Sequence, residues 1–166
     1  MPLKKQFLFF YLGIICSPIL FAANPFPEKN YQKEYYNNGT LKAEGWELGA
    51  TKTDYWYFYY PNGEVASKGS FSNNKREGYW YFYDDNTTLL KQGHYQNGIA
   101  EDWWIFYDIA TQTEKRFQFK NDKKNGFAFI YKKGRLKRAE AYKNNQKTGE
   151  WTSIFAFKKD NPHLTF

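Results

Sequence analysis

The residues of this chain that could carry out chemistry are few and scattered. Only two histidines, His94 and His163, and one cysteine, Cys16, occur in 166 residues. Two histidines cannot build a histidine metal centre without carboxylate help, and one thiol excludes a disulfide scaffold. A catalytic histidine also needs a positioned partner, and no serine lies in a Gly-x-Ser-x-Gly elbow. The sequence therefore predicts no metal, no cofactor and no enzymatic activity.

Two carboxylate pairs, Asp84-Asp85 and Glu101-Asp102, are of the residue type that hydrolyses glycosidic bonds. Both pairs fall at expected strand ends or connections, so we interpret them as charges that solvate turns. His94 occupies a repeat position that holds a serine one unit earlier, so the repeat accounts for its place. No glycine-rich phosphate-binding loop is present.

Residues 1–23 have the pattern of a secretory signal peptide. Lys4 and Lys5 precede an uncharged stretch from Phe7 to Ala23, which ends in small residues. This stretch is interrupted by Pro18 and is shorter than the roughly 20 apolar residues that span a bilayer. We therefore expect an exported protein, periplasmic or secreted, that is cleaved near Ala23. An uncleaved membrane anchor is the alternative.

Charge is distributed unevenly along the rest of the chain. Residues 24–113 carry 8 basic and 12 acidic side chains, whereas residues 114–166 carry 14 basic and 5 acidic. Such polarity concerns partners and association rates rather than the fold. An ordinary solvated surface is the alternative interpretation. Because an exported protein rarely meets nucleic acid, we expect no nucleic-acid partner.

Aromatic residues, 22% of the chain, recur with a period of 24 residues, which marks an internal repeat. The array covers residues 31–157 in about five units, after a linker at 24–30 and before a tail at 158–166. Tryptophans lead the pattern, and other series keep the same step until the fifth unit, which is one residue shorter. The series are Trp56, Trp80, Trp104, Ala128 and Trp151; Tyr59, Tyr83, Tyr107 and Tyr131; Phe71, Tyr95, Phe119 and Tyr142; Asp54, Gly78, Asp102, Gly126 and Gly149; and Gly45, Gly69, Gly93 and Phe117.

Each unit predicts one β-hairpin. In the second unit, residues 55–60 form an aromatic strand, residues 61–63 a tight Pro-Asn-Gly turn, and residues 64–71 the return strand. Residues 72–78 are expected to connect this hairpin to the next. No stretch keeps a 3.6-residue apolar period, so no substantial helix is predicted. The predicted fold class is all-β, an elongated single antiparallel sheet of tandem hairpins stabilised by aromatic ladders.

Strand alternation assigns the aromatic side chains to two faces of this sheet. One face is expected to hold the four tryptophans of the repeat with Phe58, Phe82 and Phe106. The other face is expected to hold Tyr57 and Tyr81 with the four tyrosines of the repeat. We expect one face to be enclosed by the curvature of the sheet and the other to stay accessible.

The string from Gly78 to Tyr83 (GYWYFY), with a hairpin turn and a return strand after it, resembles the variant MORN repeat. Asp54 and Asp102 replace the glycine in neighbouring units, and residues 35–45 are the most faithful half-repeat. Bacterial proteins of this kind are commonly labelled YwqK-like antitoxin family members. The resemblance implies a MORN-like scaffold that binds another protein, in the antitoxin case a toxin. MORN repeats have also been linked to membrane phospholipid.

We therefore predict an exported, non-enzymatic scaffold that binds another protein, such as an immunity protein that neutralises a periplasmic toxin. The alternative is a peripheral envelope protein that docks on an anionic membrane surface through its basic C-terminal half. A carbohydrate-binding or carbohydrate-acting protein is the third class. Tyrosines are enriched in interface hot spots, and basic charges steer acidic partners. The candidate partner-binding residues are Tyr59, Tyr83, Tyr107, Tyr131, Lys132, Lys133, Arg135, Lys137 and Arg138, and the candidate structural residues are Trp56, Gly78, Trp80, Trp104, Gly126, Gly149 and Trp151.

Overall fold

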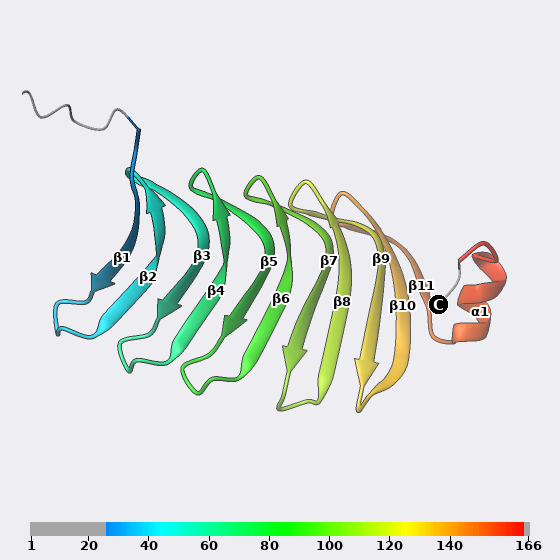
Figure 1. The fold of residues 1–166 in the computed structure, drawn as a ribbon. Coiled ribbons are helices and arrows are strands. Elements are labelled where there is room, and N and C mark those ends of the chain that lie inside the picture. The colour runs from blue at the N-terminus through cyan, green and yellow to red at the C-terminus, as the bar shows by residue number, and fades with distance from the viewer. Residues whose placement is uncertain (1–25, 165–166) are drawn as a thin grey trace, which may run out of the picture.

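A computed structural model describes residues 26–164, which form one open antiparallel sheet followed by a short helix (Figure 1). The predicted signal peptide lies outside the described residues. Eleven strands follow one another in chain order, each hydrogen-bonded to the next, and this elongated sheet of hairpins confirms the predicted fold class. The strands are β1 (Lys29–Tyr35), β2 (Leu41–Leu48), β3 (Thr51–Tyr59), β4 (Val65–Ser72), β5 (Lys75–Tyr83), β6 (Leu89–Gln96), β7 (Ile99–Asp108), β8 (Thr113–Lys120), β9 (Lys123–Lys132), β10 (Arg135–Lys143) and β11 (Gln146–Trp151).

Short turns join most hairpins to the next along the sheet. Asn73 and Asn74, with φ angles of 50° and 62°, form a two-residue turn between β4 and β5. The prediction that residues 72–78 form a connection is therefore wrong, because β5 already begins at Lys75. Asparagine tolerates the left-handed conformation, so two residues suffice for the turn. The turn also packs back on the previous hairpin, since the Asn74 side chain accepts a hydrogen bond from the Lys52 amide at 2.7 Å.

The core of the molecule lies on one face of this single sheet, which we call the tryptophan face. Trp56 and Trp80 are completely buried there, at 0% exposure. The ring of Phe58 lies 6.1 Å from each of these two indoles, which builds the predicted ladder. Every strand pair except β7–β8 carries a register irregularity, and such bulges bend strands, as Figure 1 shows. Basic side chains pack over the aromatic rings of the tryptophan face. The Lys52 ammonium, for example, lies 3.4 Å from the Trp56 ring centroid.

Each buried indole lies over a glycine of the preceding strand. A Cβ atom added to Gly69 would be 2.4 Å from the Trp80 ring, so a glycine is required at this position. The indole nitrogen then donates to the carbonyl of the next residue, from Trp80 Nε1 to Ser70 O at 2.9 Å. The same arrangement, which we call the glycine seat, recurs where Trp56 lies over Gly45 and where Trp104 lies over Gly93. The common period of the glycines and the tryptophans is thus a packing requirement.

The β8–β9 pair reverses the sizes of the two packing partners. Phe117 in β8 occupies the glycine position, and Ala128, opposite it in β9, occupies the tryptophan position. Both residues are buried. A large residue on one strand therefore still faces a small residue on its neighbour, which explains why both series change at the same place in the chain.

Trp151 lies on the face opposite to the one predicted for it. Its ring packs on Phe127 and Phe157 on the opposite face, which we call the tyrosine face. The flip arises where β11 pairs with β10. One extra residue of β11 lies opposite the step from Ala141 to Tyr142, whereas two extra residues of β5 lie opposite the step from Gly69 to Ser70. A difference of one residue moves a side chain to the other face of a sheet. The assignment of Trp151 to the tryptophan face was therefore wrong.

One short helix, α1 (Ile154–Asp160), follows the last strand and was not predicted. The Ser153 hydroxyl caps it by accepting a hydrogen bond from the Ala156 amide at 3.1 Å. Phe157 is fully buried and lies 5.2 Å from Phe127 and 5.6 Å from Phe129. The helix therefore covers the C-terminal end of the tyrosine face and leaves the remainder uncovered among the described residues.

Candidate partner-binding face

The four predicted tyrosines lie near the ends of β3, β5, β7 and β9 on the tyrosine face, and all are half-buried. Each contacts the side chain 15 residues earlier, on the preceding, paired strand. We call these eight residues the tyrosine stripe. The Tyr59 hydroxyl donates to Glu44 Oε1 at 2.6 Å, Gln92 Nε2 donates to the Tyr107 hydroxyl at 3.0 Å, Lys68 Nζ lies 5.6 Å from the Tyr83 ring centroid, and the Arg116 guanidinium lies 4.7 Å from that of Tyr131.

Each end of the tyrosine stripe holds an ion pair, Glu44 with Lys33 at 3.6 Å and Arg116 with Glu114 at 2.5 Å. Burial and the hydrogen bond to Glu44 raise the pKa of Tyr59, so its hydroxyl stays protonated. The same hydrogen bond lowers the pKa of the Glu44 carboxyl, so that group stays ionised at neutral pH. At the other end, a hydrogen bond to Glu114 raises the pKa of Arg116. Both ends of the stripe thus carry charges that are already paired within the chain.

A second aromatic row on the same face is more exposed than the stripe. Tyr55, Tyr79 and Trp103 are 36%, 63% and 37% exposed. They lie in β3, β5 and β7, and a groove of about 210 Å³ separates Tyr79 from Trp103. The repeat pattern does not single out these residues, because their type varies between tyrosine and tryptophan. Their position in the repeat could have identified them. Each directly precedes a buried tryptophan, so strand alternation places its side chain on the tyrosine face.

The predicted basic stretch forms the hairpin between β9 and β10. Lys132, Lys133, Arg135 and Lys137 surround a hollow of about 490 Å³. Within residues 26–164, none of these four side chains forms an ion pair. Lys133 also lines a neighbouring pocket of about 400 Å³ together with Tyr107 and Tyr131. The structure therefore brings the basic hairpin and the C-terminal end of the tyrosine stripe together at Lys133.

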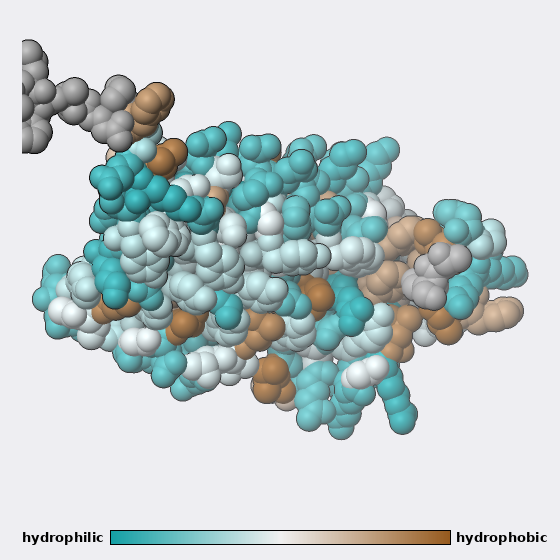
Figure 2. Space-filling view, in the orientation of Figure 1, coloured by the Kyte–Doolittle hydropathy of each residue, from teal (hydrophilic) through white to brown (hydrophobic). Residues whose placement is uncertain are grey.

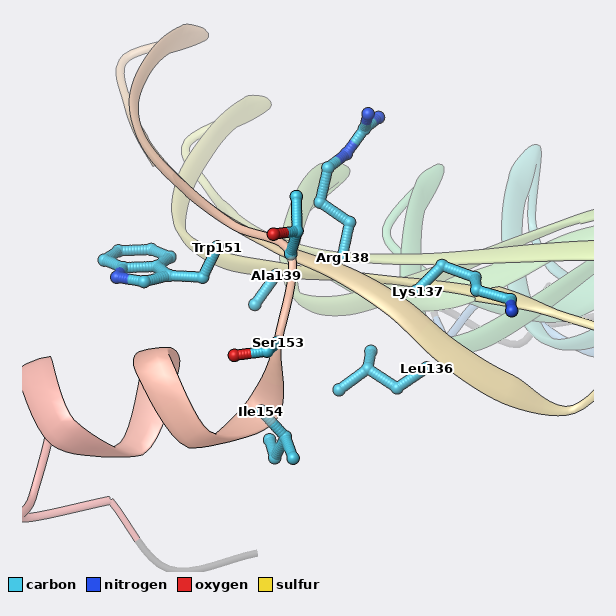
Figure 3. Close-up of a pocket in the computed structure, with 8 residues that line it drawn as sticks. Leu136, Lys137, Arg138, Ala139, Trp151, Ser153 and Ile154 are labelled. Atoms are coloured by element: carbon cyan, nitrogen blue, oxygen red, sulfur yellow. The ribbon is translucent and has the colours of Figure 1, made fainter.

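Arg138 does not join this group. Its Nε lies 2.8 Å from the Glu140 carboxylate, which is only 3% exposed, and Lys147 approaches the same carboxylate at 3.5 Å. Figure 3 shows Arg138 pointing away from Leu136 and Ile154, which lie on the side of α1. Arg138 therefore neutralises a buried carboxylate on the far side of the sheet from the tyrosine stripe.

The cavity drawn in Figure 3 lies between β10, β11 and the start of α1 and has a volume of about 10 Å³. Such a space holds roughly one water molecule, whereas small-molecule sites measure about 300–1,000 Å³. It is a packing gap under the helix and is too small for a metabolite.

The candidate structural glycines divide into two kinds. Gly78 and Gly126 have φ angles of 70° and 115°, and the aspartates at the same repeat position, Asp54 and Asp102, have 53° and 59°. This position requires the left-handed conformation, which glycine adopts freely and aspartate tolerates. Gly149 is not among the residues with positive φ. A Cβ atom there would instead lie 2.8 Å from the Trp151 ring.

The residue types that could carry out chemistry serve turns and packing. Within residues 26–164, no three or more His, Cys, Asp or Glu side chains are placed to hold a metal ion. The His94 ring packs edge-on against Tyr79 at 5.3 Å, and its Nδ1 is buried without a hydrogen-bond partner. Asp84 Oδ1 accepts hydrogen bonds from the Asn86 and Thr88 amides. Glu101 likewise accepts one from the amide of an asparagine in the next turn.

No family model and no curated protein matches this chain. In the part of the chain that the structure describes, no helix is long and apolar enough to cross a membrane. Function is therefore inferred from the two faces of the sheet.

Proposed function

We propose that this protein is an exported, non-enzymatic scaffold that binds a partner protein through its tyrosine face. The observation that carries the proposal is the asymmetry of the sheet. One aromatic face is closed into a core, whereas the other keeps Tyr79, Trp103 and their neighbours exposed. Tyrosine and tryptophan offer large, rigid contact area with few rotatable bonds, and they dominate interface hot spots.

The basic hairpin between β9 and β10 would orient a bound partner on this surface. Lys133 lies beside Tyr107 and Tyr131, and it shares a hollow with Lys132, Arg135 and Lys137. Since these four cations form no ion pair within residues 26–164, they would attract an acidic partner and orient it on the stripe. The signal-peptide pattern and the repeat resemblance agree with an envelope toxin as that partner, in which case this protein is its immunity protein.

The experiment is a matched capture from the native envelope with identification by mass spectrometry. The unaltered mature chain is compared with Tyr79→Ala/Trp103→Ala, and Phe155→Ala, on the exposed surface of α1, is the control. We expect a specific partner that is lost with the double variant and kept with the control. Capture of the same proteins by all three chains would refute the tyrosine face as the binding surface.

A second candidate function has its own observation. Ile154 and Phe155 of α1 are 44% and 78% exposed, and Ile154 lines the same small cavity as Lys137. Figure 2 shows apolar side chains gathered at the α1 end of the molecule. Exposed apolar residues next to unpaired cations suit the surface of an anionic membrane. Salt-sensitive binding to anionic liposomes that is lost with Phe155→Ala would favour this function over the first.

A further inference from the structure

Strand β1 is a free edge of the sheet. All seven of its residues are exposed, and within residues 26–164 it pairs only with β2. At the opposite edge, β11 is followed by α1 (Figure 1). A free edge presents unpaired backbone amides and carbonyls, which can accept another strand.

The backbone groups of β1 that point outward can be identified. The carbonyl of Glu28 accepts a hydrogen bond from the Gly49 amide at 3.3 Å, so Glu28 points its backbone groups toward the rest of the sheet. Backbone groups alternate along a strand, so those of Lys29, Tyr31 and Lys33 point away from β2. These residues are the ones that an added strand would bond.

Lysines on an edge strand usually prevent such pairing, but here they are neutralised. Lys29 lies 2.6 Å from Asp54, and Lys33 lies 3.6 Å from Glu44. The Lys29 ammonium also lies 5.0 Å from the centroid of the Trp46 ring. The edge therefore carries little net charge, so a second copy can approach it wherever no two lysines stand directly opposite each other.

We propose that two copies of this chain pair through β1, antiparallel, about a two-fold axis at Gln32. In this register the sequence KNYQKEY is complementary to itself. Tyr31 faces Lys33 of the second copy, Lys29 faces its Tyr35, and Asn30 faces its Glu34. Such an isologous interface closes as a dimer and leaves no further β1 edge.

Charge selects this register over its neighbours. Moving the axis to Tyr31 places Lys29 opposite Lys33, and moving it to Lys33 places that lysine opposite its own copy. Like charges directly opposite each other destabilise a strand pair. A shift of the register by a single residue would place each residue whose backbone groups point outward opposite one whose groups point toward its own β2, so the hydrogen bonds could not form.

The dimer would join the tyrosine faces of the two copies. Tyr31 packs edge-on against Trp46 at 5.2 Å and lies on the same face as the tyrosine stripe. Pairing through β1 would therefore continue this aromatic face across the two-fold axis. The dimer goes beyond the proposed function and does not depend on it, because the pairing is argued from β1 alone.

The first test is a cysteine cross-link in a Cys16→Ser background. Opposite residues of a non-hydrogen-bonded antiparallel pair have Cα atoms about 4.5 Å apart, within the range for a disulfide. Gln32→Cys should therefore cross-link to twice the monomer mass under mild oxidation, whereas Lys29→Cys, at a position that is also exposed, should not. Equal cross-linking of both variants, or of neither, would overturn the proposal.

The second test leaves the chain free of engineered thiols. Light scattering after size exclusion should show a concentration-dependent dimer of the unaltered chain. Lys33→Pro removes an outward amide and keeps the hydrogen bonds to β2, so it should weaken the dimer about tenfold or more. Circular dichroism checks that the variant is folded. A chain that stays monomeric at all concentrations, or a folded proline variant that dimerises equally well, would contradict the proposal.

Discussion

The two faces of the sheet use the same class of residue for opposite purposes. On the tryptophan face, a ring such as Trp80 lies over Gly69 and is completely buried. On the tyrosine face, a ring such as Tyr83 stands beside the long polar side chain of Lys68 and remains half-buried. The residue opposite the ring therefore decides whether an aromatic side chain becomes core or surface.

The sharpest test of this contrast compares two adjacent residues. Trp80→Ala should lower the free energy of unfolding by about 3–5 kcal/mol, because it empties a buried site. Tyr79→Ala, one residue earlier and 63% exposed, should change it by less than about 1 kcal/mol. Chemical denaturation of the two variants measures both values. Similar losses would show that both faces contribute equally to the core.

The glycine seat can be tested without changing any aromatic residue. Gly69→Ala should destabilise by about 1–3 kcal/mol, because the added methyl group overlaps the Trp80 ring and forces it to move. Ser67→Ala, two residues earlier in the same strand, is the matched control and should have little effect. A Gly69→Ala variant as stable as the control would mean that the indole can shift freely.

On the tyrosine face, binding and stability should separate. Tyr83→Ala should speed dissociation of the partner by about tenfold, as loss of an interface aromatic does. Charge reversal at Arg135 and Lys137 should slow association and leave dissociation nearly unchanged, and this difference should shrink as salt rises past about 0.15 M. Binding kinetics and thermal melting measure the two effects. Lost stability with unchanged affinity of the folded fraction would assign Tyr83 to packing alone.

The smallest expected effect is a dependence of stability on acid at Glu44. Its folded-state pKa is lowered, first by the hydrogen bond from Tyr59, so the unfolded chain binds this proton more readily. The stabilisation is therefore complete above the unfolded pKa of about 4.3 and is lost as the pH falls through the folded pKa. Glu44→Gln should flatten this part of the curve of unfolding free energy against pH. An unchanged acid limb in that variant would exclude the contact as its cause.

Much of the fold could be predicted because its physical causes are local. The 24-residue period, the turn residues and strand alternation placed Trp56, Trp80 and Trp104 on one face and the tyrosine series on the other. The limits of the strands were less predictable. A two-residue turn at Asn73 and Asn74 replaces a predicted connection of seven residues, and a bulge that is one residue shorter in β11 than in β5 moves Trp151 to the opposite face.

The candidate site was predicted in part. The tyrosine positions follow from the period, and the structure brings Lys133 beside Tyr107 and Tyr131. Sequence could not show that Arg138 is engaged by Glu140, because that pairing depends on which side of β10 each residue points after a bulge. The exposed row that includes Tyr79 was missed because its residue type is not uniform.

The sequence by itself determined the repeat, the all-β class and the alternation of aromatic residues, since all of these depend on spacing along one chain. Only the tertiary structure decided which face is closed, because burial depends on the bending of the whole sheet and on the glycine opposite each indole. The tertiary structure alone also decided that α1 covers only the end of the tyrosine face. In the part of the chain that the structure describes, it also left β1 with a strand on one side only, and such an edge follows from the order of strands in the whole sheet.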